Sequence, residues 1–387
     1  MYNILCLNNI SHYGTDLLTD SYALTDDISK ASGILVRSAD MHSMELPEDL
    51  LAIARAGAGV NNIPLDDCAK KGIVVFNTPG ANANAVKELT LCSLFLASRD
   101  IIGGAEWIKE NAQSETIAKD AEKAKKAFGG TEIIGKKLGV IGLGAIGALV
   151  ANAAVDLGMD VYGVDPYMSV DGAWKLSSRI HHVTNYDEIY KNCDYLTIHV
   201  PAMPQTVGMV DAHACSIMKP GCVFLNFSRD TLVDTEAMRA ALEEGRVAKY
   251  ITDFATPEVM KMKNVLVFPH LGASTAEAED NCAIMATRQI MDYIENGNIV
   301  NSVNFPNCTM GPKSQEGTRI AVMHANVPNM IGQISKIFGD AGENIANLTN
   351  KARGDYAYTL IDLDNEVHET AVAALNAISD IIRVRVL

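Results

Sequence analysis

The chain has 387 residues, of which 48% are hydrophobic and 20% are charged, and its formal net charge is -15. A length of this size predicts two or three domains at about 150 residues each. The acidic balance argues against nucleic acid and anionic membrane surfaces as partners, because both require basic faces.

Eight cysteines are scattered singly along the chain, and none forms a Cys-x-x-Cys pair or has zinc-ligand spacing. We therefore predict reduced thiols and no metal site. The first residues, MYNILCLNNI, have no basic stretch followed by a long apolar one, so they indicate a strand and not a signal peptide. No run approaches the roughly 18 apolar residues of a spanning helix. Together these features predict a cytoplasmic protein without membrane contact.

The first quarter of the chain alternates short apolar runs with helical patterns. Strands are predicted at residues 4–7, 33–36, 51–56 and 74–76, and a helix at 83–97. This β-then-α rhythm predicts a parallel sheet. Residues 104–127 are rich in Ala, Glu and Lys and have no wide apolar stripe. This pattern predicts one helix that is either solvated or lines a dimer interface.

A second β/α array follows. Its strands are predicted at 138–141, 160–164, 195–200, 222–226, 248–253 and 265–268, and a long helix at 275–296. Residues 296–318 are dense in Asn, Gly, Pro and Ser, which is typical of a linker. The remaining block, 319–387, has the order βαββαβ of a ferredoxin-like domain.

The segment KLGVIGLGAIG carries a dinucleotide-binding pattern. Gly142 permits a tight turn, Gly144 lets the backbone approach a pyrophosphate, and Gly147 lets the helix pack closely on the strand. Asp165 follows the next strand, 23 positions after Gly142. An acid at this place binds the ribose hydroxyls and repels a 2′-phosphate, which favours NAD over NADP. S-adenosylmethionine and FAD sites use related turns, and a bare structural turn is the plainer alternative.

Three later predicted strands are each followed within five residues by a side chain that can take part in catalysis, namely Arg229, Glu258 and His270. An imidazole can accept the hydroxyl proton when a hydride leaves an alcohol carbon. A carboxylate on the other ring nitrogen stabilises the imidazolium, and a guanidinium binds a carboxylate in two-pronged fashion. The set suits a 2-hydroxy acid. His199, in the motif HVP, either contacts the cofactor or only caps a loop.

These motifs resemble those of the D-isomer-specific 2-hydroxyacid dehydrogenases, most closely the phosphoglycerate dehydrogenase branch with a C-terminal ACT domain. The resemblance covers nearly the whole chain. It rests on RAGAGVNNI at 55–63, NTPGANANAVKEL at 77–89, GVIGLGAIG at 139–147, HVP at 199–201, NFSRDTLVD at 226–234, TDFATPE at 252–258 and PHLGAST at 269–275.

The resemblance implies site residues. The catalytic set would be Arg229, Glu258 and His270, with Glu258 assigned by its spacing of five residues from Asp253. NAD would be bound by Ala58, Gly142, Gly144, Ala145, Ile146, Gly147, Asp165, His199, Val200, Pro201, Phe227, Ser228, Asp253, Gly272 and Ala273. Substrate would be bound by Arg37, Arg55, Gly57, Ala58, Gly59 and Val60, together with Arg229 and His270. Lys87 is a weaker candidate.

The resemblance also implies the architecture and the reaction. A flavodoxin-like α/β substrate domain would comprise residues 1–93 and 281–308, with a Rossmann-type NAD domain, 94–280, inserted between its parts. A linker, 309–318, would lead to an ACT regulatory domain, 319–387. The implied reaction is the NAD-dependent oxidation of D-3-phosphoglycerate to 3-phosphooxypyruvate, the first step of L-serine biosynthesis. L-serine would be an effector at His324, Asn326 and Asn344, and the assembly a homodimer or homotetramer.

Three alternatives remain open from the residues. The chain could oxidise another D-2-hydroxy acid, such as glycerate or 2-hydroxyglutarate. It could be a cofactor-binding regulator without turnover, although the complete Arg, Glu and His set argues against this. The last domain could serve only in assembly.

Overall fold

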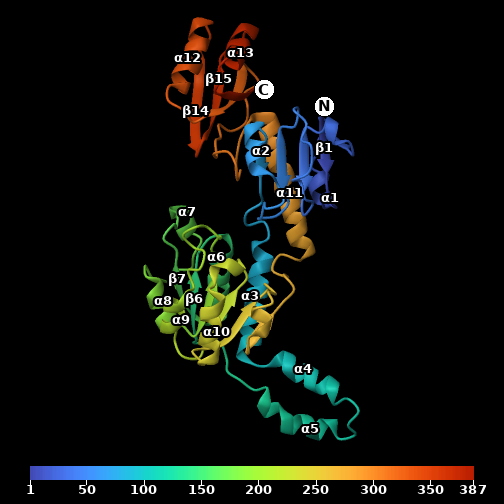
Figure 1. The fold of residues 1–387 in the computed structure, drawn as a ribbon, viewed down its shortest axis with the longest axis vertical. Coiled ribbons are helices and arrows are strands. Elements are labelled where there is room, and N and C mark those ends of the chain that lie inside the picture. Colours follow the sequence, from blue (N-terminus) through green and yellow to red (C-terminus); the bar gives the residue numbers. More distant parts are fainter. The chain divides into compact units, whose positions relative to one another are not determined.

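A computed structural model describes all 387 residues, and the chain divides into two compact units (Figure 1). Unit 1 comprises residues 1–82 and 276–387, and unit 2 comprises residues 83–275. The last ferredoxin-like block therefore lies in the same unit as the N-terminal sheet. The expected boundary at residue 93 falls inside helix α3, Ala83–Ser98.

The N-terminal part of unit 1 is a five-stranded parallel sheet in the order β2-β1-β3-β4-β5. This is the flavodoxin order, as predicted. Its elements are β1 (Tyr2–Cys6), α1 (His12–Thr15), β2 (Tyr22–Thr25), η1 (Ile28–Lys30), β3 (Gly33–Val36), β4 (Ala52–Arg55), α2 (Leu65–Lys70) and β5 (Val74–Phe76). Strand β2 was not predicted, because this edge strand has a single buried residue, Tyr22.

Both faces of this sheet are covered. Helix α11 (Ala276–Asn296) packs Ala286 and Ile290 against strand residues such as Leu35 on one face. Ile34 and Ile53, which alternate with the first set along the strands, pack into a separate core on the other face. With the faces occupied, the carboxyl ends of the strands are where a ligand can reach the backbone.

Unit 2 contains a seven-stranded parallel sheet in the order β12-β11-β10-β9-β6-β7-β8. This order reverses on either side of β6, which is the Rossmann arrangement. The strands are β6 (Lys137–Ile141), β7 (Asp160–Val164), β8 (His181–His182), β9 (Tyr195–Ile198), β10 (Cys222–Asn226), β11 (Val247–Thr252) and β12 (Val265–Val267).

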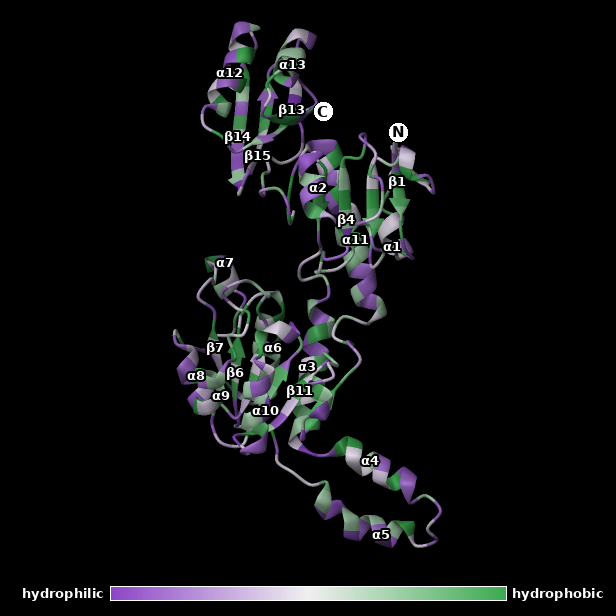
Figure 2. Ribbon diagram, viewed as in Figure 1, coloured by the Kyte–Doolittle hydropathy of each residue, from purple (hydrophilic) through white to green (hydrophobic).

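Helices cover both faces of the Rossmann sheet, whose strands are largely hydrophobic (Figure 2). Leu94 of α3 and Val150 of α6 belong to the core on one face. Ile189 of α8 and Met238 of α10 belong to the core on the other. The remaining elements are α6 (Ala145–Asp156), α7 (Val170–Ala173), α8 (Tyr186–Asn192), α9 (Ala212–Ile217), η3 (Asp230–Leu232), α10 (Thr235–Glu243) and η4 (Val259–Lys261).

The Ala, Glu and Lys rich stretch forms two helices, α4 (Ile101–Glu110) and α5 (Ile117–Ala124), followed by η2 (Lys125–Ala127). The prediction of one helix over 104–127 is therefore wrong. The hydroxyls of Ser114 and Thr116 each donate to Asp120 Oδ2 at 2.9 Å. These bonds tie the first turn of α5 to the residues before it, although the side chain of the N-cap Thr116 accepts from no backbone amide. Judged by length and hydropathy, none of the helices qualifies as a membrane span.

The C-terminal block is an antiparallel sheet in the order β14-β15-β13-β16, which fits the ferredoxin-like prediction and an ACT-like domain. Its elements are β13 (Thr318–Ala325), α12 (Met330–Asp340), β14 (Ile345–Arg353), β15 (Tyr356–Leu363), α13 (Glu369–Asn376) and β16 (Ile381–Val386). Val322 and Ile361 pack against the helices. Met323 and Tyr358, on the opposite face, join the core of the N-terminal sheet.

Residues 297–317 have no regular secondary structure but are not a free tether. Asn304 lies beside β5, where its Oδ1 accepts from the Val75 amide and its Nδ2 donates to the Ile73 carbonyl, both at 2.9 Å. Phe305 is fully buried in the core that includes Phe76. This segment thus extends the edge of the sheet and leads into β13.

Candidate functional site

The turn between β6 and α6 is built from three glycines with different roles. Gly142 has φ +87°, and a Cβ there would lie 2.7 Å from the carbonyl oxygen of His199. A Cβ on Gly147 would lie 1.9 Å from the carbonyl oxygen of Gly142. A Cβ on Gly144 would meet nothing within 4 Å. The first and last glycines are therefore required by packing, whereas Gly144 borders open space that a ligand can fill.

Helix α6 begins directly after this turn. The amides of Ala145, Ile146 and Gly147 lie in its first turn, where N–H groups have no partner inside the helix. The helix dipole adds positive potential at the same place. This helix start is therefore suited to a pyrophosphate.

Asp165 follows β7 and is held in place by two backbone amides. Its Oδ2 accepts from Leu143 and its Oδ1 from Tyr167, both at 2.9 Å. Each carboxylate oxygen can accept a further hydrogen bond. The Asp165 carboxylate beside the glycine turn can therefore accept hydrogen bonds from ribose hydroxyls. Its negative charge disfavours a 2′-phosphate.

The segment His199–Pro201 follows β9 and walls the Gly142 turn. His199 Nε2 lies 2.9 Å from Thr197 Oγ1, while Nδ1 is buried without a partner. Burial lowers the pKa of His199 to about 3, so the ring is neutral. Ser228 Oγ donates to the Ile198 carbonyl at 2.7 Å, and this bond ties the end of β10 to the end of β9. Neighbouring Phe227 is buried.

Asp253 is the most buried carboxylate among the predicted site residues, at 3% exposure. Its Oδ2 accepts from the Gly272 amide at 3.0 Å, and its Oδ1 is buried without a partner. Burial raises the pKa of Asp253, and this effect is opposed by the Gly272 amide and the charges of His270 and Arg229. Arg229 and His270 are therefore close enough to the Asp253 carboxylate to interact with it electrostatically. The free Oδ1 is suited to the amide of a nicotinamide.

His270 stands in an uncommon backbone conformation, with φ +51°. Its amide is bonded to the carbonyls of Asp253 at 3.1 Å and Phe268 at 3.0 Å. Its exposed ring meets Phe254 edge-on, with centroids 5.3 Å apart, and makes no hydrogen bond. Strained backbone at a non-glycine residue is concentrated at functional sites. The backbone of His270 is thus held by two hydrogen bonds, and both ring nitrogens are without a partner in the protein.

Arg229 and Glu258 are both exposed. Arg229 Nη1 donates to the Ser228 carbonyl at 2.6 Å. Glu258 lines a cavity of about 270 Å³ with Phe254 and other residues of unit 2. No hydrogen bond or ion pair joins Glu258 to His270, so their predicted pairing stays a prediction. Lys87, the weaker candidate, forms an ion pair in which its Nζ lies 3.7 Å from Glu88 Oε1.

The predicted substrate residues of unit 1 lie at the carboxyl ends of β3 and β4. These strands are paired with Val36 opposite Arg55, which brings Arg37 and Arg55 to the same sheet edge. Arg55 Nε donates to the Arg37 carbonyl at 3.0 Å. Arg37 Nη2 forms an ion pair with Glu279 at 2.6 Å.

The loop after β4 presents backbone donors beside these arginines. Gly57 has φ +146°, a conformation that side chains rarely adopt. The amides of Ala58, Gly59 and Val60 donate to no acceptor in the protein. Arginine side chains beside amides that have no acceptor are groups able to bind an anion.

The predicted effector residues belong to the C-terminal sheet and its connections. His324 is 2% exposed. Its Nδ1 lies 2.8 Å from the Ala325 carbonyl and its Nε2 lies 2.9 Å from Thr359 Oγ1. Burial lowers the pKa of His324. Asn326 donates to the Gly354 carbonyl at 3.0 Å, and Asn344 donates to Asp364.

Known proteins share this fold and much of this sequence. The family described as D-isomer specific 2-hydroxyacid dehydrogenase, NAD binding domain, matches residues 91–272. A D-3-phosphoglycerate dehydrogenase of Escherichia coli (strain K12) is 33% identical, over 88% of this chain and 82% of that protein. The chain belongs to the D-isomer-specific 2-hydroxyacid dehydrogenase family.

Further relatives of this dehydrogenase agree with that assignment. A D-3-phosphoglycerate dehydrogenase of Haemophilus influenzae is 29% identical, over 98% of this chain and 92% of that protein. The NADPH-dependent glyoxylate/hydroxypyruvate reductase of Sinorhizobium meliloti superposes with a TM-score of 0.65 at 20% identity. That superposition covers 78% of this chain and 98% of the reductase, and it shows the shared fold.

The dehydrogenase is an NAD-dependent oxidoreductase. The residues present fit the cofactor, because Gly144 leaves open space and Asp253 Oδ1 is a buried acceptor without a partner. Asp165 supplies the acid expected at the ribose. When bound, NAD supplies the acceptor for a hydride.

Three residues that contact the predicted substrate residues of the dehydrogenase were not among the sequence predictions. Asn8 Oδ1 accepts from the amides of Arg37, Ser38 and Ala39 at 2.9 to 3.0 Å. Asn77 Nδ2 donates to the Ala58 carbonyl at 2.7 Å. Glu279 pairs with Arg37, as described above. The available signal for both asparagines was their position directly after a predicted strand.

Proposed function

We propose that this dehydrogenase oxidises D-3-phosphoglycerate to 3-phosphooxypyruvate, the first step of L-serine synthesis. The observation that carries the proposal is the anion receptor at the ends of β3 and β4. Arg37 and Arg55 lie beside the unpartnered amides of Ala58, Gly59 and Val60. Guanidinium and backbone N–H groups are the donors that phosphate oxygens accept from in proteins. Relatives bearing the name D-3-phosphoglycerate dehydrogenase support the same substrate.

The proposed chemistry divides the work among residues of unit 2. His270 accepts the proton of the C2 hydroxyl while the hydride leaves the same carbon for NAD. Arg229 binds the substrate carboxylate and stabilises the developing ketone. Asp253 Oδ1 orients the nicotinamide through its amide group. The positive charge that develops on His270 lies within the field of Asp253.

Glu258 has the role of stabilising the imidazolium in this proposal. Its carboxylate is not bonded to His270 in the structure, so the pair must form when substrate is bound. Catalytic hydrogen bonds that are absent in the free enzyme often form once substrate is bound. Phe254 contacts the His270 ring edge-on and lines the same cavity as Glu258.

A substrate panel tests the proposal. D-3-phosphoglycerate, D-glycerate and D-2-hydroxyglutarate are each offered with NAD and with NADP, and reduced cofactor is followed by absorbance. We expect D-3-phosphoglycerate with NAD to have the highest kcat/KM, and Arg37→Met to lower it about tenfold or more. Equal turnover of D-glycerate, or no response to Arg37→Met, contradicts phosphate recognition.

A second candidate is the oxidation of another D-2-hydroxy acid. The ion pair of Arg37 with Glu279 favours it, because an arginine already neutralised by an acid is a weaker phosphate ligand. The panel separates the two candidates, since a substrate without phosphate would depend on Arg229 and His270 but not on Arg37.

The proposal extends to L-serine as an effector at His324, Asn326 and Asn344. The amide groups of both asparagines are exposed and can bind the charged groups of an amino acid. Repeating the panel with L-serine tests this part. Inhibition that persists in Asn344→Ala would speak against these residues.

We also propose a homodimer or homotetramer working in the cytoplasm. Helix α4 exposes Ile101 and Ile108 at 48% and 43%, which supports a second copy as the covering partner. All eight cysteines are free, which is usual in a reducing compartment. Light scattering coupled to size exclusion tests the assembly.

A further inference from the structure

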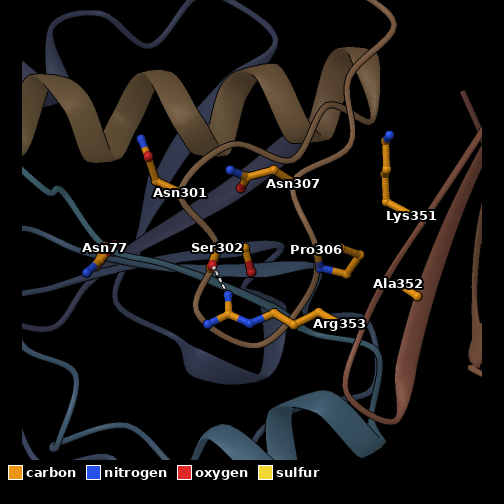
Figure 3. A pocket seen from close by; sticks show the side chains of 8 residues that line it. All are labelled: Asn77, Asn301, Ser302, Pro306, Asn307, Lys351, Ala352 and Arg353. Atoms are coloured by element: carbon orange, nitrogen blue, oxygen red, sulfur yellow. Dashed lines mark hydrogen bonds between the residues drawn. The ribbon is translucent and has the colours of Figure 1, made fainter. Parts of the chain in front are cut away.

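A cavity of about 390 Å³ lies in unit 1 between β14 and the loop that precedes β13 (Figure 3). It is distinct from the receptor formed by Arg37 and Arg55. Its lining consists of Asn77, Asn301, Ser302, Pro306, Asn307, Lys351, Ala352 and Arg353. The volume is sufficient for a small organic molecule.

The two cations of the cavity come from alternate positions of β14. Lys351 pairs with Tyr358 and Arg353 with Tyr356 in the antiparallel ladder. Tyr358 faces the N-terminal sheet, and residues two apart on a strand share a face. Both cations are therefore directed to the side of the loop and not to that of α12 and α13.

These cations have unused binding capacity. Arg353 Nη1 donates to the Ser302 carbonyl at 2.8 Å, and its other N–H groups make no hydrogen bond (Figure 3). The Lys351 ammonium makes no hydrogen bond or ion pair, and no acidic side chain lines the cavity. In a chain with a formal net charge of -15, two cations without an acid form a local site of opposite sign.

Amide side chains complete the lining. Asn301 and Asn307, from the loop that precedes β13, line the cavity with amide side chains (Figure 3). From these groups we propose that the cavity binds a small organic dianion, a phosphate monoester or a dicarboxylate, as a regulatory ligand. Charged oxygens accept from Lys351 and Arg353, and the asparagine amides donate to the remaining lone pairs.

Asn77 connects this cavity to the proposed substrate loop. One N–H of its amide donates to the Ala58 carbonyl at 2.7 Å, while its main-chain amide donates to the Asn301 carbonyl at 3.3 Å. A side-chain amide has a second N–H that can donate to a ligand at the same time. A bound dianion thus immobilises Asn77 and, through it, the Gly57–Val60 loop. This coupling rests on the proposed role of that loop in substrate binding.

Binding is tested apart from activity. Inorganic phosphate and succinate are titrated by calorimetry into the full-length Arg37→Met variant, which removes a cation of the substrate receptor. We expect one site per chain, weakened about tenfold by adding Lys351→Met, because a charge-assisted hydrogen bond is lost. Lys336→Met, which removes an exposed cation on α12, is the matched control and should leave binding unchanged.

Three outcomes overturn the site. Equal binding with and without Lys351→Met means that Lys351 is only a solvated lysine on the edge strand β14. Equal weakening by Lys336→Met means a general charge effect. Absence of binding by both anions removes the proposal altogether. Lys351 is exposed and unpaired, so its replacement does not endanger folding.

Coupling is tested by kinetics in the wild-type chain. We expect succinate to lower KM for D-3-phosphoglycerate about fivefold, the lower range of allosteric coupling, with kcat unchanged. Competition at the substrate receptor would raise KM, so the sign of the change separates the two sites. Asn77→Ala should still bind succinate but lose the effect on KM. A KM that rises or stays constant in the wild type refutes the coupling, and failure to oxidise any substrate refutes the proposed function while leaving the binding result intact.

Discussion

The two units prepare for their ligands in opposite ways. In unit 2, Asp253 Oδ1 and His199 Nδ1 are buried without partners, and Gly144 borders open space. In unit 1, Arg37 is already paired with Glu279, and Arg55 is bonded to the main chain. A buried polar atom without a partner costs about 1–3 kcal/mol, whereas an exposed ion pair contributes about 0–1 kcal/mol. We infer that the proposed cofactor site is preformed, whereas the proposed anion receptor contains an arginine that is already paired with an acid.

Removing the proposed base should give the largest effect. His270→Asn should lower kcat about a thousandfold, because the hydroxyl proton loses its acceptor, while the Kd for NAD stays unchanged. A steady-state assay gives kcat and a titration with NAD gives Kd, and both are measured on one preparation of the variant. His213→Asn, at an exposed histidine of α9, is the matched control. Activity near that of the control would remove His270 from the catalytic set.

Filling the open space at Gly144 should give the next largest effect. Gly144→Ala should weaken NAD binding by about tenfold or more, because a methyl group keeps the pyrophosphate from the backbone. Fold stability should change little, since that methyl group meets no protein atom within 4 Å. Gly339→Ala provides the comparison, as its Cβ also meets nothing within 4 Å. Unaltered NAD affinity would show that this space is not the cofactor site.

Releasing Arg37 should have a smaller effect of opposite sign. Glu279→Gln should lower KM for D-3-phosphoglycerate up to about fivefold, because an exposed ion pair contributes at most about 1 kcal/mol. The gain should shrink at high salt, which screens the pair in the wild type. Glu277→Gln removes an exposed acid of the same helix that has no ion pair. If both variants lower KM equally, the change reflects net charge and not the pair.

Most of the fold follows from local patterns in the sequence. Strands such as Asp160–Val164 and Cys222–Asn226 are apolar runs bounded by loops, and the structure has them at the predicted residues. Short edge strands escaped, because His181–His182 has no apolar periodicity to detect. The break between α4 and α5 escaped too, since the Ala, Glu and Lys composition of the stretch does not reveal where one helix ends and the next begins.

The candidate site was predictable where its chemistry resides in a motif. Gly142, Gly144 and Gly147 stand in the turn that their spacing indicates. Partners distant in the chain were not predictable, because only the folded sheet brings Glu279 to Arg37 and Asn8 to the amide of Arg37. The bond expected between Glu258 and His270 is likewise a matter of three-dimensional approach, which spacing along the chain does not fix.

The smallest expected effect concerns the stability of unit 2 at low pH. Burial lowers the pKa of His199 to about 3 from 6.5, so the folded state resists protonation more than the unfolded state does. The stability that depends on the neutral ring is complete above the unfolded pKa and declines as the pH falls below it. We expect the urea midpoint, followed by circular dichroism, to drop as the pH falls from about 6.5 toward about 3, and to drop less in His199→Gln. His213→Gln should retain the wild-type dependence, because that side chain is exposed. If His199→Gln and the wild type lose stability in parallel, the unpartnered Nδ1 of His199 is accessible to protons, and the contrast between a preformed cofactor site and an acid-held anion receptor then rests on Asp253 and Gly144.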